Sequence, residues 1–137
     1  MKRMIIPALG LLALSTTAYA EGDAADGEKD FKKCRSCHTI ASETEVIYKG
    51  GKTGPNLYGV IGRVAGSTDF KYSDALIDAG EGGLIWTEEE LTKFIADPTA
   101  YLREVTGDSK ARSKMTFKMK DGDDVAAYLA SVAPAAE

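Results

Sequence analysis

The chain has 137 residues, 44% of them hydrophobic, and its 17 basic and 21 acidic side chains give a net charge of −4. This length predicts a single domain, and the composition excludes a disordered or fibrous protein. The acidic balance argues against a protein that binds nucleic acid through a general basic surface. The scarce residue types are two cysteines, one histidine and one tryptophan.

The first twenty residues have the pattern of a cleaved export signal. Lys2 and Arg3 precede an apolar run over residues 5–18, and Ala18-Tyr19-Ala20 matches a small-residue cleavage site. The apolar run is shorter than the roughly 20 residues of a spanning helix, although an uncleaved anchor is the alternative. Cleavage would leave residues 21–137, a single domain of 117 residues, and the loss of two basic residues would change the net charge from −4 to −6. The sequence therefore predicts an exported, soluble, acidic protein.

Short helices and a long loop are expected in the first half of this domain. The first helix should start near Asp23 or Asp26 and run past Phe31 into Cys34, because acids in its first turn suit the positive end of the helix dipole. A glycine-rich stretch follows, and its lack of strand periodicity predicts a loop. A short helix over residues 73–79 should begin at the N-cap Ser73, with Gly80 just past its end.

The second half carries clearer helix signals. Thr87 is the expected N-cap of a helix in which Glu90 completes a capping box. The pair Asp97-Pro98 should end this helix and start a further turn. A last helix is expected from about Asp121 to Ala133. Its apolar face comprises Val125, Tyr128, Leu129 and Val132. The predicted class is all-α, with short helices and long loops.

The string Cys34-Arg35-Ser36-Cys37-His38 matches the haem-attachment signature C-x-x-C-H. At a helix end, Cys37 and His38 lie three and four residues after Cys34, so all three side chains project from one side. A thioredoxin-like thiol pair would need a βαβ context, for which the sequence gives no sign. A structural zinc site needs four ligands, so a carboxylate would have to join the two cysteines and the histidine. We therefore interpret the string as a haem site.

The sixth position of the iron needs a separate ligand or stays open. His38 is the only histidine, and removal of the signal leaves Met115 and Met119 as the only thioethers. Each methionine is alternatively a core-filling side chain. In a haem protein without a second histidine, a methionine ligand is the favoured interpretation.

Motifs spread over the whole of residues 21–137 carry a family resemblance. They are Gly27, Phe31, Cys34 to His38, Gly54-Pro55-Asn56-Leu57-Tyr58-Gly59, Gly62-Arg63, Trp86, Asp97-Pro98, Lys114-Met115-Thr116-Phe117 and Ala127-Tyr128-Leu129. Together they resemble the class I cytochromes c, in particular the larger soluble electron carriers of alphaproteobacteria. The resemblance implies a class I cytochrome c fold wrapped round one covalently attached haem c.

The same resemblance implies ligands for that haem. Cys34 and Cys37 would form the thioether bonds. His38 and Met115 would be the axial ligands of the iron, with Met119 as the alternative to Met115.

The resemblance also implies supporting contacts around the haem. The Pro55 carbonyl would accept a hydrogen bond from the histidine ring and fix its orientation. Arg63, Tyr72 and Trp86 would face the propionates, although each is alternatively a core aromatic or a surface cation. Phe94 departs from the pattern, since many relatives carry a tyrosine there.

One close contact and two loop lengths complete the comparison with the family. Gly27 and Tyr128 would form the close crossing between the first and last helices, because glycine permits close backbone approach. The segments from His38 to Pro55 and from Tyr101 to Met115 are longer than in the mitochondrial form.

These features predict a one-electron carrier, not an enzyme, located in the periplasm and monomeric. Basic residues flank both ligand segments (Lys32, Lys33, Arg35, Lys110, Arg112, Lys114, Lys118 and Lys120). They would form a positive face that steers acidic partners to the haem edge. The family implies a cytochrome bc complex or periplasmic dehydrogenase as donor. It implies cytochrome c oxidase or another terminal oxidase, a nitrogen-oxide reductase or a photosynthetic reaction centre as acceptor.

A different functional class remains as the alternative. An open sixth site would make the chain a haem-based ligand sensor or a peroxide-reducing enzyme. A distal histidine, a usual aid to peroxide chemistry, is not available to such an enzyme, because His38 is the only histidine.

Overall fold

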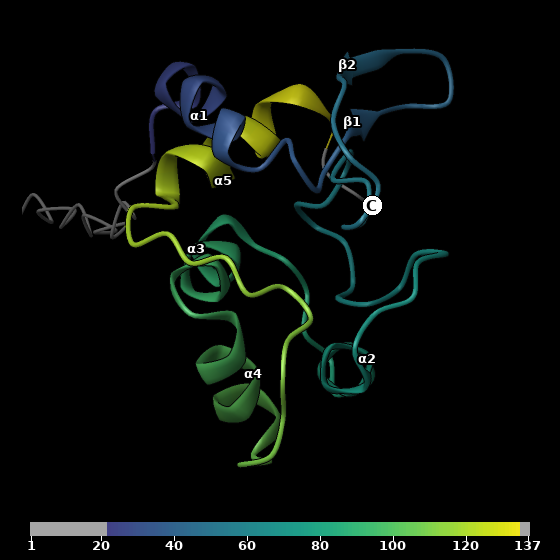
Figure 1. The fold of residues 1–137 in the computed structure, drawn as a ribbon, viewed down its shortest axis with the longest axis vertical. Helices are drawn as coiled ribbons and strands as arrows, with labels where there is room; N and C mark the ends of the chain where they lie inside the picture. Colours follow the sequence, from purple (N-terminus) through teal and green to yellow (C-terminus); the bar gives the residue numbers. More distant parts are fainter. Residues whose placement is uncertain (1–21, 135–137) are drawn as a thin grey trace, which may run out of the picture.

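The computed structural model describes residues 22–134, which form short helices, one small hairpin and long loops (Figure 1). In chain order the elements are α1 (Ala24–Asp30), the 3-10 turn η1 (Phe31–Lys33), β1 (Ile40–Ala41), β2 (Val46–Tyr48), α2 (Asp74–Glu81), α3 (Glu88–Ala96), α4 (Pro98–Thr106) and α5 (Asp123–Val132). The predicted export signal over residues 1–20 lies outside the described residues. Between residues 22 and 134, each helix is too short or too polar to cross a membrane.

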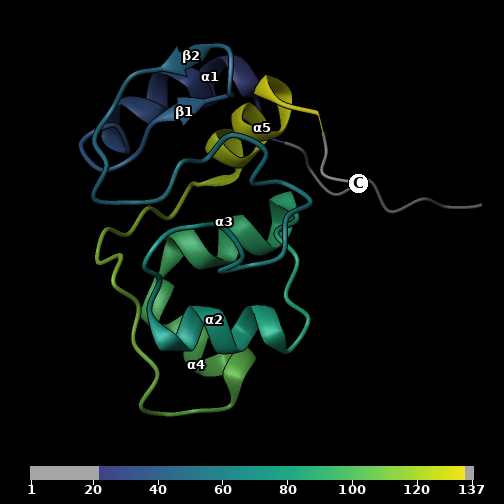
Figure 2. The same ribbon diagram turned by 90° about the vertical axis from the view of Figure 1, so that its right-hand side faces the viewer.

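Helices α1 and α5 pack across one another at one end of the molecule, with α3, α2 and α4 beyond them (Figure 2). A Cβ atom on Gly27 would lie 1.9 Å from the carbonyl oxygen of Asp124 and 2.8 Å from Cβ of Tyr128. The predicted close crossing of Gly27 and Tyr128 is therefore confirmed. Phe31 is fully buried beside this crossing, and its ring centroid lies 4.8 Å from that of Tyr48 and 5.8 Å from that of Tyr128.

The first helix ends earlier than predicted. It is capped by Asp23, as expected, but α1 stops at Asp30 and the tighter turn η1 leads into Cys34. The Cys34 N–H donates to the Phe31 carbonyl at 2.8 Å, an i→i+3 bond of the 3-10 type. The prediction of one helix running into Cys34 is thus wrong at its end, where the chain tightens after the buried Phe31.

Helix α2 is capped by Ser73, as expected, but extends past Gly80 to Glu81. A Cβ atom on Gly80 would lie 1.9 Å from the carbonyl oxygen of Ala65. Glycine at this position therefore allows a close approach between helix and loop, and it does not mark the helix end.

The predicted capping box of α3 is confirmed for only one of its two hydrogen bonds. The N–H of Glu90 donates to the Thr87 hydroxyl at 3.1 Å, as predicted. The Glu90 carboxylate bonds to the Tyr101 hydroxyl and pairs with Lys93. Its partners are therefore side chains of α3 and α4, and the predicted reciprocal bond to the backbone of the cap residue is not among its contacts.

Two further differences concern the length of α4 and the start of the last helix. Asp97 caps α4 and Pro98 occupies its first turn, but α4 is a nine-residue helix and not the single turn that was predicted. The last helix, α5, begins at Asp123, two residues later than expected, with Val125, Tyr128 and Leu129 buried on the predicted face.

The long loop that follows His38 contains an antiparallel hairpin of β1 and β2, with Ile40 opposite Tyr48. Strands of two and three residues are too short to produce an alternating pattern, which explains why the sequence predicted only loop. The Asn56 side chain fastens the hairpin to the next segment, donating to the Ala41 carbonyl at 2.7 Å and accepting from its N–H at 3.1 Å.

Candidate haem site

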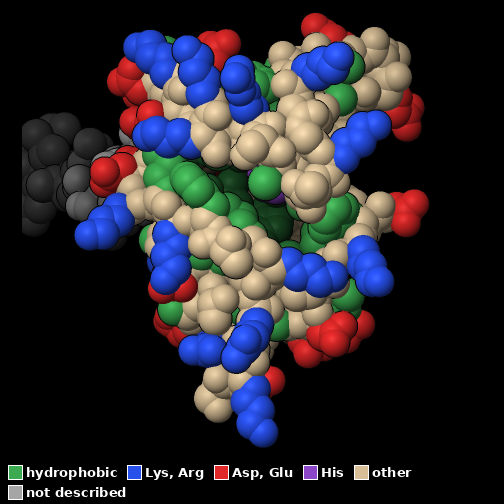
Figure 3. Space-filling model, viewed as in Figure 1, with side chains coloured by type: hydrophobic (Ala, Val, Ile, Leu, Met, Phe, Trp, Pro, Cys, Tyr) green, Lys and Arg blue, Asp and Glu red, His purple; other side chains and the backbone are tan. Residues whose placement is uncertain are grey.

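A cavity of about 560 Å³ opens at the centre of the face in Figure 3, between the α1 and α5 pair and helices α2 to α4. Its lining is mainly apolar, and its volume lies in the range of cofactor sites. The residues predicted for the site all contribute to the lining: Cys34, Cys37, His38, Pro55, Arg63, Tyr72, Trp86 and Met115, with Met119. Side chains far apart in the sequence are thereby brought to one cavity.

The cysteines and the histidine come from a single turn. The N–H groups of Cys37 and His38 both donate to the Cys34 carbonyl, at 3.2 and 3.0 Å, so the three side chains reach the same cavity. Burial, with a further contribution from Asp30, raises the pKa of the Cys34 thiol to about 11. Redox-active thiol pairs have a lowered pKa instead.

Among residues 22–134 there is also no cluster of three or more His, Cys, Asp or Glu side chains suited to a metal ion. A zinc site would require such a cluster. The local chemistry therefore favours neither the thioredoxin-like nor the zinc interpretation of the cysteine motif.

The His38 ring is held on both sides. Its Nδ1 donates to the Pro55 carbonyl at 2.8 Å, which is the hydrogen bond that the family resemblance implies. Because a carbonyl oxygen can only accept, the proton lies on Nδ1, and Nε2 keeps its lone pair. Burial lowers the pKa of His38, against a smaller opposing effect of the bond to Pro55, so the ring is neutral at pH 7.

Gly54 forms the floor under this ring. A Cβ atom there would lie 2.4 Å from Cε1 of His38, and the Gly54 N–H donates to the Cys37 carbonyl at 2.8 Å. The ring therefore occupies a fixed position, with an unprotonated nitrogen available to a metal.

A short backbone ladder places Arg63 and Trp86 side by side at the cavity wall. The Trp86 N–H donates to the Arg63 carbonyl at 2.9 Å, and the Gly62 N–H donates to the Trp86 carbonyl at 2.6 Å. Burial lowers the pKa of the Arg63 guanidinium, which donates to the carbonyls of Tyr58 and Asn56, both at 3.3 Å. These acceptors are neutral, and a carboxylate would bind this buried cation more strongly.

Aromatic side chains continue this wall. The Trp86 ring lies 5.1 Å from the Phe94 ring and 6.1 Å from the Tyr101 ring, with the latter pair stacked. Tyr72 is buried and its hydroxyl forms a hydrogen bond with the Thr68 hydroxyl. Phe94, at the position where the family resemblance implies tyrosine in many members, lines the cavity without a hydroxyl.

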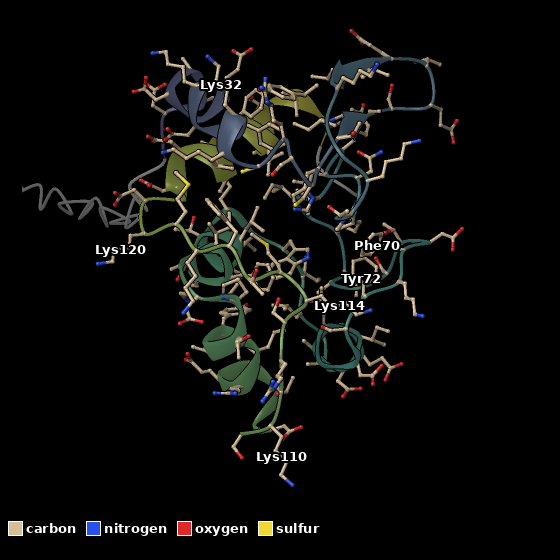
Figure 4. The ribbon with its side chains drawn as sticks, viewed as in Figure 1. Lys32, Phe70, Tyr72, Lys110, Lys114 and Lys120 are labelled. Carbon is tan, nitrogen blue, oxygen red and sulfur yellow. The ribbon has the colours of Figure 1, made fainter. Side chains whose placement is uncertain are left out.

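The methionine segment closes the cavity from the other side. Five consecutive residues, Ser113 to Phe117, line it, and the Met115 N–H donates to the Ser113 hydroxyl at 3.0 Å. The Lys114 ammonium crosses to the segment before α2 and donates to the carbonyls of Lys71 and Tyr72, at 2.9 and 3.2 Å (Figure 4). Met119 also lines the cavity, but its N–H is tied to the Ile95 carbonyl at 2.9 Å.

Basic side chains lie on the face of the molecule that holds the cavity. In Figure 3 Lys and Arg side chains are spread over this face, on several sides of the hollow, whereas Asp and Glu lie mainly toward the outline of the molecule. Lys33, Lys71 and Lys114 line the cavity and form its basic rim, and Figure 4 shows Lys114 beside Tyr72. Lys32, Lys120 and Lys110 lie farther out, toward the outline of the molecule. An acidic protein thus presents a face that is locally positive.

Three contacts in and beside the site were not predicted from the sequence. They are the packing of Gly54 against the His38 ring, the hydrogen bonds between Asn56 and Ala41, and the hydrogen bonds from Lys114 to distant carbonyls. Gly54 and Asn56 belong to a motif that carried the family resemblance. The motif therefore marked these two residues, but it did not indicate what they contact. Lys114 is one of many lysines, and only its approach to distant carbonyls distinguishes it.

The residues present fit a covalently attached haem. The cavity offers apolar walls, two thiols from one turn, an imidazole with a free lone pair, and a guanidinium that donates to two neutral carbonyls.

Comparisons with known proteins agree with this chemistry, although no protein-family model matches the chain. Cytochrome c-551 of Roseobacter denitrificans is 51% identical over 134 residues, which cover 96% of each chain. Cytochrome c2 of Rhodobacter capsulatus is 53% identical over 124 residues, covering 88% of this chain and 90% of that protein. The structure of ferric cytochrome c-550 from Paracoccus versutus matches with a TM-score of 0.80 and 48% identity, covering 83% of this chain and 100% of the other.

The chain belongs to the class I cytochrome c family. The predicted fold class is therefore confirmed, with the small hairpin as an addition. Its cofactor is one covalently bound haem of the c type, and it is an electron-transfer protein.

Proposed function

We propose that this cytochrome c carries single electrons in the periplasm, with a haem attached to Cys34 and Cys37 and ligated by His38 and Met115. The observation that carries the proposal is the convergence of both thiols, the imidazole and the Ser113–Phe117 segment on one cavity. When bound, the haem supplies a one-electron ferric/ferrous couple. A site closed by two side chains leaves no position for a substrate, so we propose a carrier and not an enzyme.

The side chains of the protein hold the group and set its environment. The Pro55 carbonyl keeps the proton on Nδ1 of His38, so Nε2 would be the atom that binds the iron. A methionine ligand raises the reduction potential, and the apolar walls exclude water from the group.

Arg63, Tyr72 and Trp86 are proposed to receive the propionates. The Arg63 guanidinium is half-buried, and its carbonyl partners at 3.3 Å are at the long end of hydrogen-bond geometry. A carboxylate would offset the cost of burying this charge. Trp86 and Tyr72 lie on the same wall and bring further donors to it.

The basic rim supports a partner surface. We propose that acidic docking faces of membrane redox complexes bind around the cavity, steered by the lysines of the rim. The donor would be a cytochrome bc complex or a periplasmic dehydrogenase. The acceptor would be a terminal oxidase such as cytochrome c oxidase, a nitrogen-oxide reductase or a reaction centre. The protein would act as a monomer, exported by the segment over residues 1–20.

Two measurements on the haem-loaded protein test this function. A potentiometric titration should follow a one-electron Nernst curve and reverse fully between the ferric and ferrous forms. The ferrous protein should bind carbon monoxide only slowly, because Met115 must first leave the iron. Rapid binding at native pH would contradict a closed site and favour a ligand sensor or a peroxide-reducing enzyme.

A further inference from the structure

The segment that brings Met115 to the cavity has no helix or strand of its own. Between the end of α4 at Thr106 and the start of α5 at Asp123, the chain runs as turns and extended backbone. Such a segment opens locally at a free-energy cost set by the few contacts that fasten it. The position of Met115 therefore depends on those contacts.

Helix α4 supplies two contacts that lie directly before the methionine. The Arg103 Nε donates to the Ala111 carbonyl at 3.0 Å, and the Ser113 N–H donates to the Thr99 hydroxyl oxygen at 3.1 Å. The Ser113 hydroxyl in turn accepts from the Met115 N–H at 3.0 Å. A continuous chain of hydrogen bonds thus connects α4 to the methionine backbone.

The geometry of α4 suits this task. Thr99 and Arg103 are four residues apart, so they lie on the same face of the helix. Tyr101 and Leu102 are 6% and 0% exposed and bind the other side of α4 to the core. The helix is therefore a fixed support, and Ala111, whose carbonyl accepts from Arg103 of this helix, is itself only 5% exposed.

We propose that Thr99 and Arg103 are positioning residues that hold Met115 at the haem by fixing Ala111 and Ser113 to α4. Neither side chain contributes to the lining of the cavity, so each acts through the methionine segment alone. Loss of either bond should favour the open segment and make the iron easier to reach for an added ligand. The inference rests on the proposed function, because it takes Met115 as the ligand.

Imidazole titration of the ferric, haem-loaded protein measures this opening, since imidazole must displace the methionine. Thr99→Val removes the acceptor oxygen with little change in shape, and Thr99→Ser restores it. Thr92→Val is the matched control, because the Thr92 hydroxyl donates only within its own helix, to the Glu88 carbonyl at 2.7 Å. Arg103→Lys keeps the charge and removes the Nε donor.

We expect Thr99→Val and Arg103→Lys each to bind imidazole about fivefold more tightly, the factor for one hydrogen bond of ordinary strength. Thr99→Ser and Thr92→Val should bind imidazole with an affinity close to that of the wild type. Wild-type imidazole affinity in both Thr99→Val and Arg103→Lys would overturn the inference while the ligand assignment stands. If Met115→Ala leaves the methionine-to-iron absorption band unchanged, the ligand assignment fails, and the inference fails with it.

Discussion

Gly54→Ala is the most direct perturbation of the ring that is proposed to bind the iron. The added Cβ would lie 2.4 Å from Cε1, 2.7 Å from Nδ1 and 2.9 Å from Nε2 of His38, where ordinary contacts begin near 3.4 Å. The ring must therefore move by about 1 Å, which breaks its 2.8 Å bond to the Pro55 carbonyl or strains it severely. Gly54 has no positive φ, so steric overlap alone is being tested.

The expected cost has two parts. Overpacking costs about 1–3 kcal/mol, and loss of the hydrogen bond costs about 1 kcal/mol more. For a domain of this size, a total of about 2–4 kcal/mol lowers the Tm by about 6–20 °C.

Thermal unfolding of the haem-loaded protein, followed by far-UV circular dichroism, measures this loss. Gly82→Ala is the matched control, because a Cβ there meets only the carbonyls of Asp78 and Ala79, at 3.3 and 3.4 Å, at the end of α2. The control should unfold close to the wild type. A Tm of Gly54→Ala within about 2 °C of the control would refute the fixed-ring account.

Three further predictions address other parts of the structure. Gly27→Ala should destabilise the protein by about 1–3 kcal/mol in denaturant unfolding, because its Cβ would meet the α5 backbone; a loss no greater than that of Gly82→Ala would contradict the close crossing. The Ala100 N–H, and then Lys118 at 2.9 Å, lower the pKa of Asp97 below 3.8. The ionised form therefore stabilises the fold fully above about pH 5, and this contribution disappears as the pH falls through the folded pKa. Asp97→Asn, which keeps a capping oxygen, should thus lose stability relative to the wild type at pH 7 and approach it at low pH, and a difference independent of pH would refute this. Electron transfer with ferricyanide should slow as ionic strength rises, despite the net negative charge of the protein, whereas acceleration by salt would refute steering by the basic rim.

The sequence predicts the elements whose signals are local. Ser73, Thr87 and Asp97 cap their helices as expected, because a cap needs only its own first turn. The turn from Cys34 to His38 is also local, and its spacing alone brings three side chains to one cavity.

Contacts between distant segments could not be predicted in this way. The carbonyls that Lys114 reaches lie 42 and 43 residues away, and the acceptor of the Arg103 Nε is a backbone atom with no signature in its side chain. Gly80 is the opposite case. From the sequence alone this glycine was interpreted as the residue after a helix end, whereas in the structure it allows the close approach of α2 to Ala65. Such contacts depend on which loops pack against each other, and the hydrophobic periodicity of the sequence does not predict this.

The visible spectrum of the ferric, haem-loaded protein tests the central claim most directly. The account predicts a weak band at the red end from methionine sulfur to iron, lost in Met115→Ala and retained in Met119→Ala. A high-spin spectrum without this band in the wild type would contradict the closed His38–Met115 site, and with it the assignment of electron carriage to this geometry.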